Sequence, residues 1–177
     1  MKQFSSGHAM QSAWVVDDLD AAVDAWLAVG VGPFFCMEYT PDFFEESTYR
    51  GSPSPISMKI AMAQAGDMQI ELIEPTGEQA NIYRDTVPEG KTAFHHLCYW
   101  TDDLDAEIES LVEQGYEVAA TGTVAGSGAT FAYVDTSPVL GHMTELFTYS
   151  DDIKGFFDMV AAASIDWDGS DPKRQLG

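Results

Sequence analysis

The chain has 177 residues, of which 45% are hydrophobic and 12% aromatic, and this composition predicts one folded domain and excludes a disordered chain. Its 8 lysines and arginines stand against 29 aspartates and glutamates, a formal net charge of −21, which argues against binding to nucleic acid. No apolar stretch reaches the roughly 18 residues of a membrane span. We therefore expect a soluble, cytoplasmic protein with no membrane partner, in which Cys36 and Cys98 form neither a disulfide framework nor a metal motif.

An internal repeat organises the chain. The segment QSAWVVDDLDAAVDAWLAVG (11–30) aligns without gaps with HLCYWTDDLDAEIESLVEQG (96–115). Each copy is typical of a strand followed by a capped turn and a helix, because its apolar residues recur at helical spacing and aspartates stand at the helix start. Gly30 and Gly115 favour a left-handed cap at the end of each helix.

Strand-like runs follow each predicted helix, separated by glycine, proline and serine. They cover 33–39, 56–63 and 68–74 in the first half, and 116–120, 129–135 and 142–149 in the second, with a turn at 121–128. Each half therefore reads as a βαβββ module. The aromatic segment at about 41–55 is expected to be a long loop, either a lid or pocket wall or a loop packed on itself or on a partner.

The predicted fold class is α+β, with the two βαβββ modules forming a curved mixed sheet around a central cleft. The modules cover about 8–75 and 93–149, so that 1–150 makes a single domain. A helix over 151–163 and a polar tail to 177 complete the chain, and we expect this helix on the outside of the sheet or at an oligomer contact.

Four polar residues stand at corresponding places in the two modules. Gln11 and His96 lie on the first strands, whereas Glu71 and Glu145 lie inside apolar runs on the last strands. One interpretation places each glutamate on a solvated strand face. A pseudo-twofold between the modules would instead bring together one imidazole nitrogen, one amide oxygen and two carboxylates, which suit a divalent metal ion such as Zn, Ni, Co, Mn or Fe.

The remaining histidines are expected to lie away from this site. Strand alternation directs His95 to the face opposite His96, where it would be structural. His142 and His8 each stand three residues before a ligand candidate, Glu145 and Gln11, so strand alternation also directs them to the opposite face. A register shift in the first strand would instead make His8 a ligand candidate.

These pieces together resemble the vicinal oxygen chelate superfamily, which includes glyoxalase I, methylmalonyl-CoA epimerase, extradiol dioxygenases and bleomycin-resistance proteins. The resemblance rests on QSAWVVDDLDAAVDAW, DMQIELIEP, HHLCYWTDDLDAEIESL and GHMTELF, and extends from Gln11 to Tyr149. It implies paired βαβββ modules around one divalent metal ion, with ligands at Gln11, Glu71, His96 and Glu145. This set is similar to that of some glyoxalase I enzymes and departs from the epimerase pattern at the first two positions.

The resemblance implies a metal-dependent lyase or isomerase in which Glu145, with Glu71 as its counterpart, moves a proton next to a chelated carbonyl. A small, fairly apolar oxygenated substrate is expected to contact Trp100, Met143 and Phe147, and Arg50 and Arg84 would hold an anionic group if they are not solvated surface cations. Two alternatives stay open: a non-catalytic binding protein of the bleomycin-resistance type, and a ring-cleaving dioxygenase with an altered iron site. We expect a homodimer, although one chain contains both modules.

Overall fold

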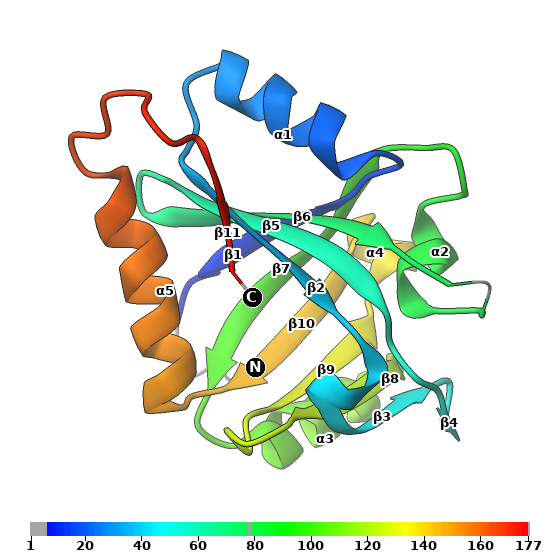
Figure 1. Cartoon of the computed structure of the whole chain (residues 1–177). Helices are drawn as coiled ribbons and strands as arrows, with labels where there is room; N and C mark the ends of the chain where they lie inside the picture. Colours follow the sequence, from blue (N-terminus) through cyan, green and yellow to red (C-terminus); the bar gives the residue numbers. More distant parts are fainter. Residues whose placement is uncertain (1–6, 78, 177) are drawn as a thin grey trace.

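The computed structural model describes residues 7–77 and 79–176, which form one strongly curved mixed sheet flanked by helices (Figure 1). The elements of the first half, in chain order, are β1 (Gln11–Val15), α1 (Leu19–Ala28), β2 (Phe34–Tyr39), the 3-10 helix η1 (Pro41–Phe43), β3 (Phe44–Tyr49), β4 (Ser52–Pro53), β5 (Met58–Ala65), β6 (Met68–Pro75) and α2 (Ile82–Thr86). The second half contains β7 (Ala93–Thr101), α3 (Leu104–Glu113), β8 (Glu117–Val124), β9 (Thr130–Asp135), α4 (Ser137–Leu140), β10 (Met143–Thr148), α5 (Asp151–Ser164) and β11 (Lys173–Gln175).

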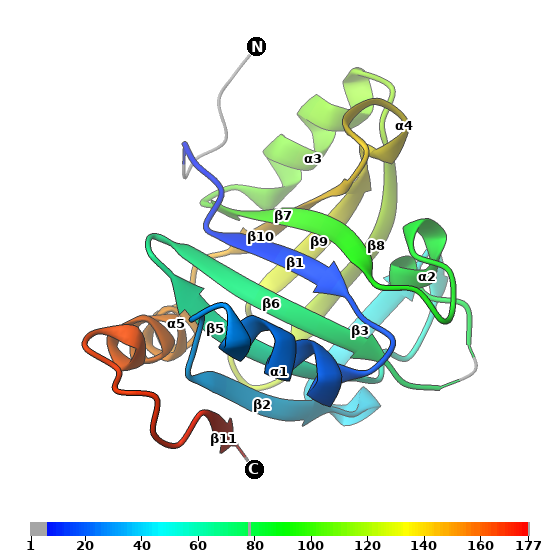
Figure 2. The ribbon, with the colours of Figure 1, turned by 90° about the horizontal axis from the view of Figure 1, so that it is seen from above.

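The two predicted modules are joined in the middle of the sheet. The strand order over the described residues is β11-β2-β5-β6-β1-β7-β10-β9-β8-β3-β4. The first strands of the two modules, β1 and β7, pair antiparallel, and each also pairs in parallel with the last strand of its own module, β6 or β10. Figure 2 shows these four strands side by side. The α+β class and the curved mixed sheet are as predicted.

Local sequence signals account for both module helices. The Asp18 carboxylate accepts a hydrogen bond from the Ala21 amide at the start of α1, and Asp103 does the same for Ala106 in α3. Gly30 and Gly115 follow the two helices with φ of 89° and 92°, in the left-handed region that glycine enters without a steric penalty. The predicted caps are confirmed at both ends.

The segment 41–55 differs from the predicted loop. After the short η1, its β3 pairs antiparallel with β8 of the second module, and β4 continues this edge of the sheet. The predicted turn at 121–128 is also wrong in its first half, because β8 extends to Val124 to pair with β3. Pairing between segments so distant in sequence outweighs the local turn preference of glycine, serine and threonine.

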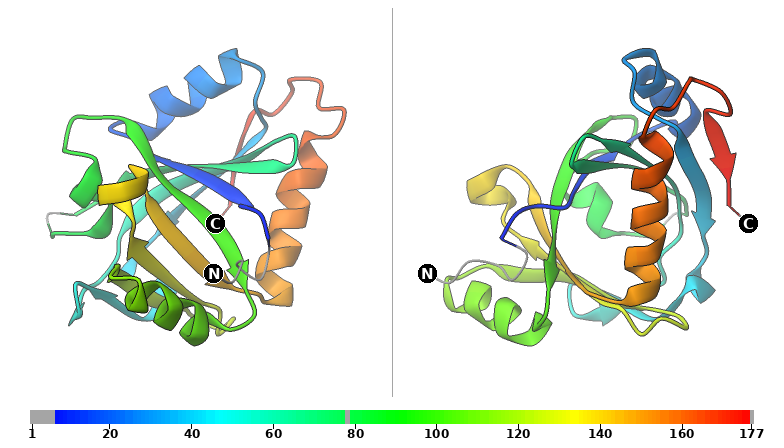
Figure 3. Two further views of the ribbon diagram at one scale, coloured as in Figure 1. Left: turned by 180° about the vertical axis from the view of Figure 1, so that it is seen from behind. Right: turned by 90° about the vertical axis from the view of Figure 1, so that its left-hand side faces the viewer.

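The C-terminal segment also differs from the prediction. Helix α5 packs against the inner, concave face of the sheet and not on its outside, and Figure 3 shows it standing across one open side of the curve. Its Val160 is fully buried in the same core cluster as Ile60 of β5. The polar tail forms the short β11, which pairs in parallel with β2.

The helices divide the core into an inner and an outer part. The inner face of the sheet and α5 enclose the largest apolar cluster, while α1 and α3 cover two smaller clusters on the outer face. Among the described residues, no helix combines the length and apolarity that crossing a membrane would require.

Candidate metal and ligand site

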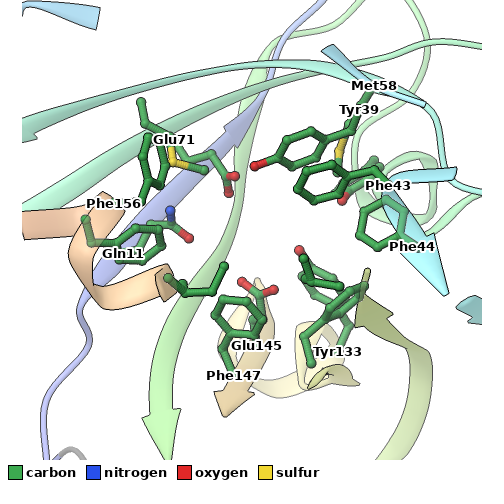
Figure 4. Close-up of a pocket in the computed structure, with 16 residues that line it drawn as sticks. Gln11, Tyr39, Phe43, Phe44, Met58, Glu71, Tyr133, Glu145, Phe147 and Phe156 are labelled. Atoms are coloured by element: carbon green, nitrogen blue, oxygen red, sulfur yellow. The ribbon is translucent and has the colours of Figure 1, made fainter. Parts of the chain in front are cut away.

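The four central strands carry the four polar residues to one place. Gln11 on β1 is in register with Gln69 on β6 and with Cys98 on β7, and Glu145 on β10 is also in register with Cys98. Neighbouring strands lie about 4.8 Å apart, and the curvature of the sheet turns the side chains on its concave face toward one another. Gln11, Glu71 and Glu145 line the same cavity (Figure 4).

His96 lies between the two carboxylates. Its Nε2 is 3.0 Å from a carboxylate oxygen of Glu145 and 3.6 Å from one of Glu71. All three side chains are buried, and His96 is completely so. Yet His96 Nε2 makes no hydrogen bond of acceptable geometry. The predicted ligand set therefore converges, with a buried imidazole nitrogen facing two glutamates.

The prediction that His95 lies on the strand face opposite His96 is wrong, because a β-bulge interrupts the pairing of β7 with β1. Across β1 and β7, Ala13 is in register with His96 but Trp14 is in register with Phe94, so His95 is the extra residue. A bulge breaks the alternation of strand faces. His95 is consequently fully buried beside His96, with their Nδ1 atoms 2.9 Å apart.

The contacts of His95 indicate that His96 Nδ1 carries a proton. His95 Nε2 lies 3.2 Å from the Ile82 carbonyl oxygen, which can only accept, so Nε2 donates. Burial, followed by the influence of His96, lowers the pKa of His95 to about 3, so its ring is neutral and its Nδ1 is an acceptor. His96 Nδ1 therefore donates, and Nε2 is the ring nitrogen that faces the glutamates.

The surroundings of Glu71 disfavour its ionised form. Burial raises the pKa of Glu71 well above its ordinary value, and the nearby Glu145 raises it further. The Gln11 amide donates to Gln69 Oε1 at 2.6 Å, which holds the amide in place on the floor of the cavity. Two glutamates and an imidazole nitrogen that face one another are a donor set that suits a divalent cation. Within 7–77 and 79–176, however, no set of three or more His, Cys, Asp and Glu side chains is already arranged around a common metal position.

The cavity above these groups is strongly aromatic. It has about 600 Å³ of empty space, its mouth included. The first module and the β3 segment contribute Tyr39, Phe43, Phe44, Met58 and Met62. The second module contributes Val124, Phe131, Tyr133 and Phe147, and α5 contributes Ile153, Phe156 and Phe157. Tyr83 of α2 completes the lining, and burial raises the pKa of Tyr39, Tyr83 and Tyr133, so their hydroxyls stay protonated and able to donate.

The residues predicted to contact substrate are divided between the cavity and its surroundings. Phe147 lines the cavity, whereas Trp100 lies behind it, stacked on Phe147 at 5.5 Å between ring centroids. Met143 is fully buried in the core. Arg50 is bound to three carboxylates outside the cavity. Arg84 donates to the carbonyls of Val87 and Pro88 and likewise does not line it.

Sequence analysis missed most of the aromatic wall. Phe43 and Phe44 belong to the segment for which a pocket wall was one of the predictions, and both line the cavity. The alternation of Met58, Ile60 and Met62 along β5 was a usable sign of an inward-facing strand. The α5 residues gave no such sign, because their helical spacing fits either side of a sheet.

Comparison with solved structures identifies the same fold in proteins of distant sequence. A hypothetical protein from Bacillus halodurans C-125 matches with a TM-score of 0.59 at 16% identity, over 80% of this chain and 94% of that one. Methylmalonyl-CoA epimerase from Mycobacterium tuberculosis matches with a TM-score of 0.56 at 16% identity, over 88% and 96%. A methylmalonyl-CoA epimerase in complex with methylmalonyl-CoA and NH4+ matches with a TM-score of 0.50 at 19% identity, over 79% and 92%.

Sequence comparison adds the family to which the chain belongs. No curated protein matches the chain significantly. A family model does match residues 10–133, a span that begins just before β1 and ends in β9. With the paired modules and the converging polar residues, this match means that the chain belongs to the Glyoxalase/Bleomycin resistance protein/Dioxygenase superfamily.

Proposed function

We propose that the protein is a metal-dependent isomerase or lyase that transfers a proton next to a chelated carbonyl group. Gln11, Glu71, His96 and Glu145 would hold one divalent ion. The observation that carries this proposal is the buried His96 Nε2, which faces two glutamates and makes no hydrogen bond.

The spacing of these donors is compatible with such an ion. Ligand atoms about 2.1 Å from a metal lie roughly 3.0 to 3.4 Å apart in octahedral or tetrahedral geometry. The measured separations of 3.0 and 3.6 Å from His96 Nε2 are close to that range, so an ion would need to draw the Glu71 carboxylate slightly inward. An imidazole, an amide oxygen and two carboxylates suit a divalent ion of borderline or hard character.

A bound ion would polarise a substrate carbonyl and lower the pKa of the proton beside it. Side chains of the protein carry out the proton transfer and hydrogen-bond the substrate. Glu145, which also receives a hydrogen bond from the Cys98 thiol, takes the proton as a general base, and Glu71 returns it on the opposite side. The protonated hydroxyls of Tyr39 and Tyr133 lie in the same cavity and can donate to substrate oxygens.

The lining supports a neutral substrate. None of the described lysines or arginines lines the cavity, so a phosphate or carboxylate on the substrate would have no cationic partner there. A small, apolar, oxygenated compound therefore fits better than a CoA or glutathione conjugate.

A second candidate is a non-catalytic binding protein of the same superfamily. The observation in its favour is the aromatic lining, which would bind an apolar molecule whether or not an ion is present. The two candidates differ in their dependence on Glu145, which the first requires both for the metal ion and for proton transfer.

Elemental analysis of the purified chain tests the proposal. We expect close to one divalent ion per chain in the wild type and a loss of at least tenfold in metal affinity in Glu145→Ala. Glu145→Gln keeps the shape of the side chain and should abolish exchange of the substrate proton with solvent. Glu113→Ala, which removes an exposed glutamate of α3, is the control and should retain the ion. A wild type that binds none of the candidate ions would contradict the proposal and leave the binding protein.

A further inference from the structure

Helix α5 forms one wall of the cavity. Its Phe156 and Phe157 line the cavity, with ring centroids 5.9 Å apart. Phe157 also packs against Trp100, at 5.4 Å between centroids, and Trp100 in turn stacks on Phe147. This chain of aromatic contacts packs the helix against side chains of β7 and β10.

The opposite wall is also aromatic. Tyr39 and Phe43 stack at 3.8 Å between centroids and 11° between planes, and Phe44 packs edge-on against Phe43. Figure 4 shows Phe156 on the other side of the cavity from Phe43 and Phe44, with Glu71 and Glu145 between them. A molecule bound over the glutamates would therefore have an aromatic surface on both sides.

Apart from Tyr39 at the end of β2, the two walls come from segments outside the repeated strands and helices of the two modules. The family model ends at residue 133, whereas α5 covers Asp151–Ser164, and the η1–β3 segment has no counterpart in the second module. The polar floor thus belongs to the repeated part of the modules. One wall comes mainly from a segment present in the first module alone, and the other from a helix beyond the span that the family model matches.

We infer that α5 determines substrate specificity, with Phe156 as the main determinant, and that it selects a neutral substrate carrying a single aromatic ring. The ring lies between Phe156 and Phe43, and its oxygen substituents point to the floor of the cavity. The direction of those oxygens rests on the proposed function, whereas the selection of a ring depends only on the walls.

Binding to the metal-free protein separates this inference from the proposed reaction. Isothermal titration calorimetry would compare 2-hydroxyacetophenone with hydroxyacetone, which has the same hydroxyketone group and no ring. We expect a dissociation constant at least tenfold lower for the aromatic ketone in the wild type. Phe156→Ala should reduce that ratio at least fivefold, and Phe156→Leu, which keeps more of the apolar volume, should reduce it less.

Met159→Ala is the matched control, because Met159 is on α5 but is 42% exposed and does not line the cavity. It should keep the wild-type ratio. A wild type without preference for the ring, or an unchanged ratio in Phe156→Ala, would overturn the inference. Tighter binding of phenyltrimethylammonium than of the aromatic ketone would also overturn it, because the walls would then select an organic cation. None of these results depends on turnover or on a metal ion.

Discussion

At the scale of single residues, His95 has the clearest indirect effect on the site. It is not among the residues that line the cavity, and its ring contacts the Ile82 carbonyl, His96 and the rings of Tyr83 and Tyr133. Its position makes His96 Nδ1 the donor and leaves His96 Nε2 facing the glutamates. Partners of this kind orient metal-binding imidazoles and raise their basicity. We therefore regard His95 as a positioning residue, and the bulge in β7 as the backbone feature that allows it to act.

Replacing His95 should weaken metal binding without removing a ligand. In His95→Phe the volume is kept but the acceptor for His96 Nδ1 is lost, so we expect metal affinity to fall by about 10- to 100-fold. Competition with a chromophoric chelator measures this directly. His96→Ala should have a larger effect, and His142→Ala should have none, because the His142 ring bonds to the Met143 carbonyl instead. Metal binding by His95→Phe at wild-type strength would show that His96 is oriented by other contacts.

At the scale of elements, Gly122 explains why β8 continues where a turn was predicted. A Cβ at this position would lie 2.4 Å from the Phe131 ring on the neighbouring β9. The ring covers the glycine and is itself held between Phe44 and Phe147 of the cavity. The glycine therefore makes room for an aromatic wall residue within a continuous strand.

A pair of glycine substitutions should have opposite effects on stability. Gly122→Ala forces the Phe131 ring to move, which should lower the free energy of unfolding by about 1–3 kcal/mol. Gly155→Ala adds a methyl group in α5 where no heavy atom lies within 4 Å, and should raise it by roughly 0.5–1 kcal/mol. Urea unfolding at neutral pH measures both. Equal effects of the two substitutions would mean that the Phe131 ring is not confined.

The elements differ in how well the sequence predicted them, and the reason is the range of the interactions involved. The helix caps at Asp18 and Asp103 depend on neighbours three residues away and were predicted. The pairing of β3 with β8 joins Tyr49 to Ala120, and the side of the sheet that α5 covers depends on contacts with β5. No local pattern contains that information.

The same distinction applies to the site. The repeat was sufficient to predict that Gln11, Glu71, His96 and Glu145 converge, because two equivalent modules place equivalent residues about one axis. It could not predict the role of His95, because a bulge of one residue leaves no sign in the alternation of apolar and polar positions. The roles of these residues in a reaction stay a prediction.

At the scale of the whole molecule, Arg50 links parts of the chain that are distant in sequence. Its guanidinium contacts Asp85 of α2 at 2.7 Å, Asp135 of β9 at 2.9 Å and Glu117 of β8 at 3.1 Å. Burial alone would raise the pKa of Asp135, but hydrogen bonds from Ser137 and Arg50 outweigh it and hold the pKa below its usual value. In a chain of net charge −21, one cation thus compensates three carboxylates at the junction of the two modules.

Arg50→Met should therefore destabilise the fold in a pH-dependent way. At pH 7 the loss should be about 1–3 kcal/mol, because two partly buried aspartates lose a charged hydrogen-bond donor. Asp135 contributes its stabilisation above its unfolded pKa of about 4, and this is lost as pH falls through its lower folded pKa. The difference between wild type and variant in urea unfolding should thus shrink from pH 6 to pH 3. Lys91→Met, which removes an exposed lysine, is the control, and a difference that grows on acidification would contradict the assignment.

Both margins of the long sheet are blunted. At one end β11 is only Lys173–Gln175, with Lys173 bound to Asp20 and Asp24 and the Arg174 guanidinium 5.4 Å from the Phe35 ring centroid. At the other end β4 is two residues long and includes Pro53, which has no amide hydrogen to donate. Short, cationic or proline-containing margins discourage strand addition from another chain. Removal of β11 would uncover β2, with the apolar run Phe34–Cys36, and turn this margin into a template for self-association.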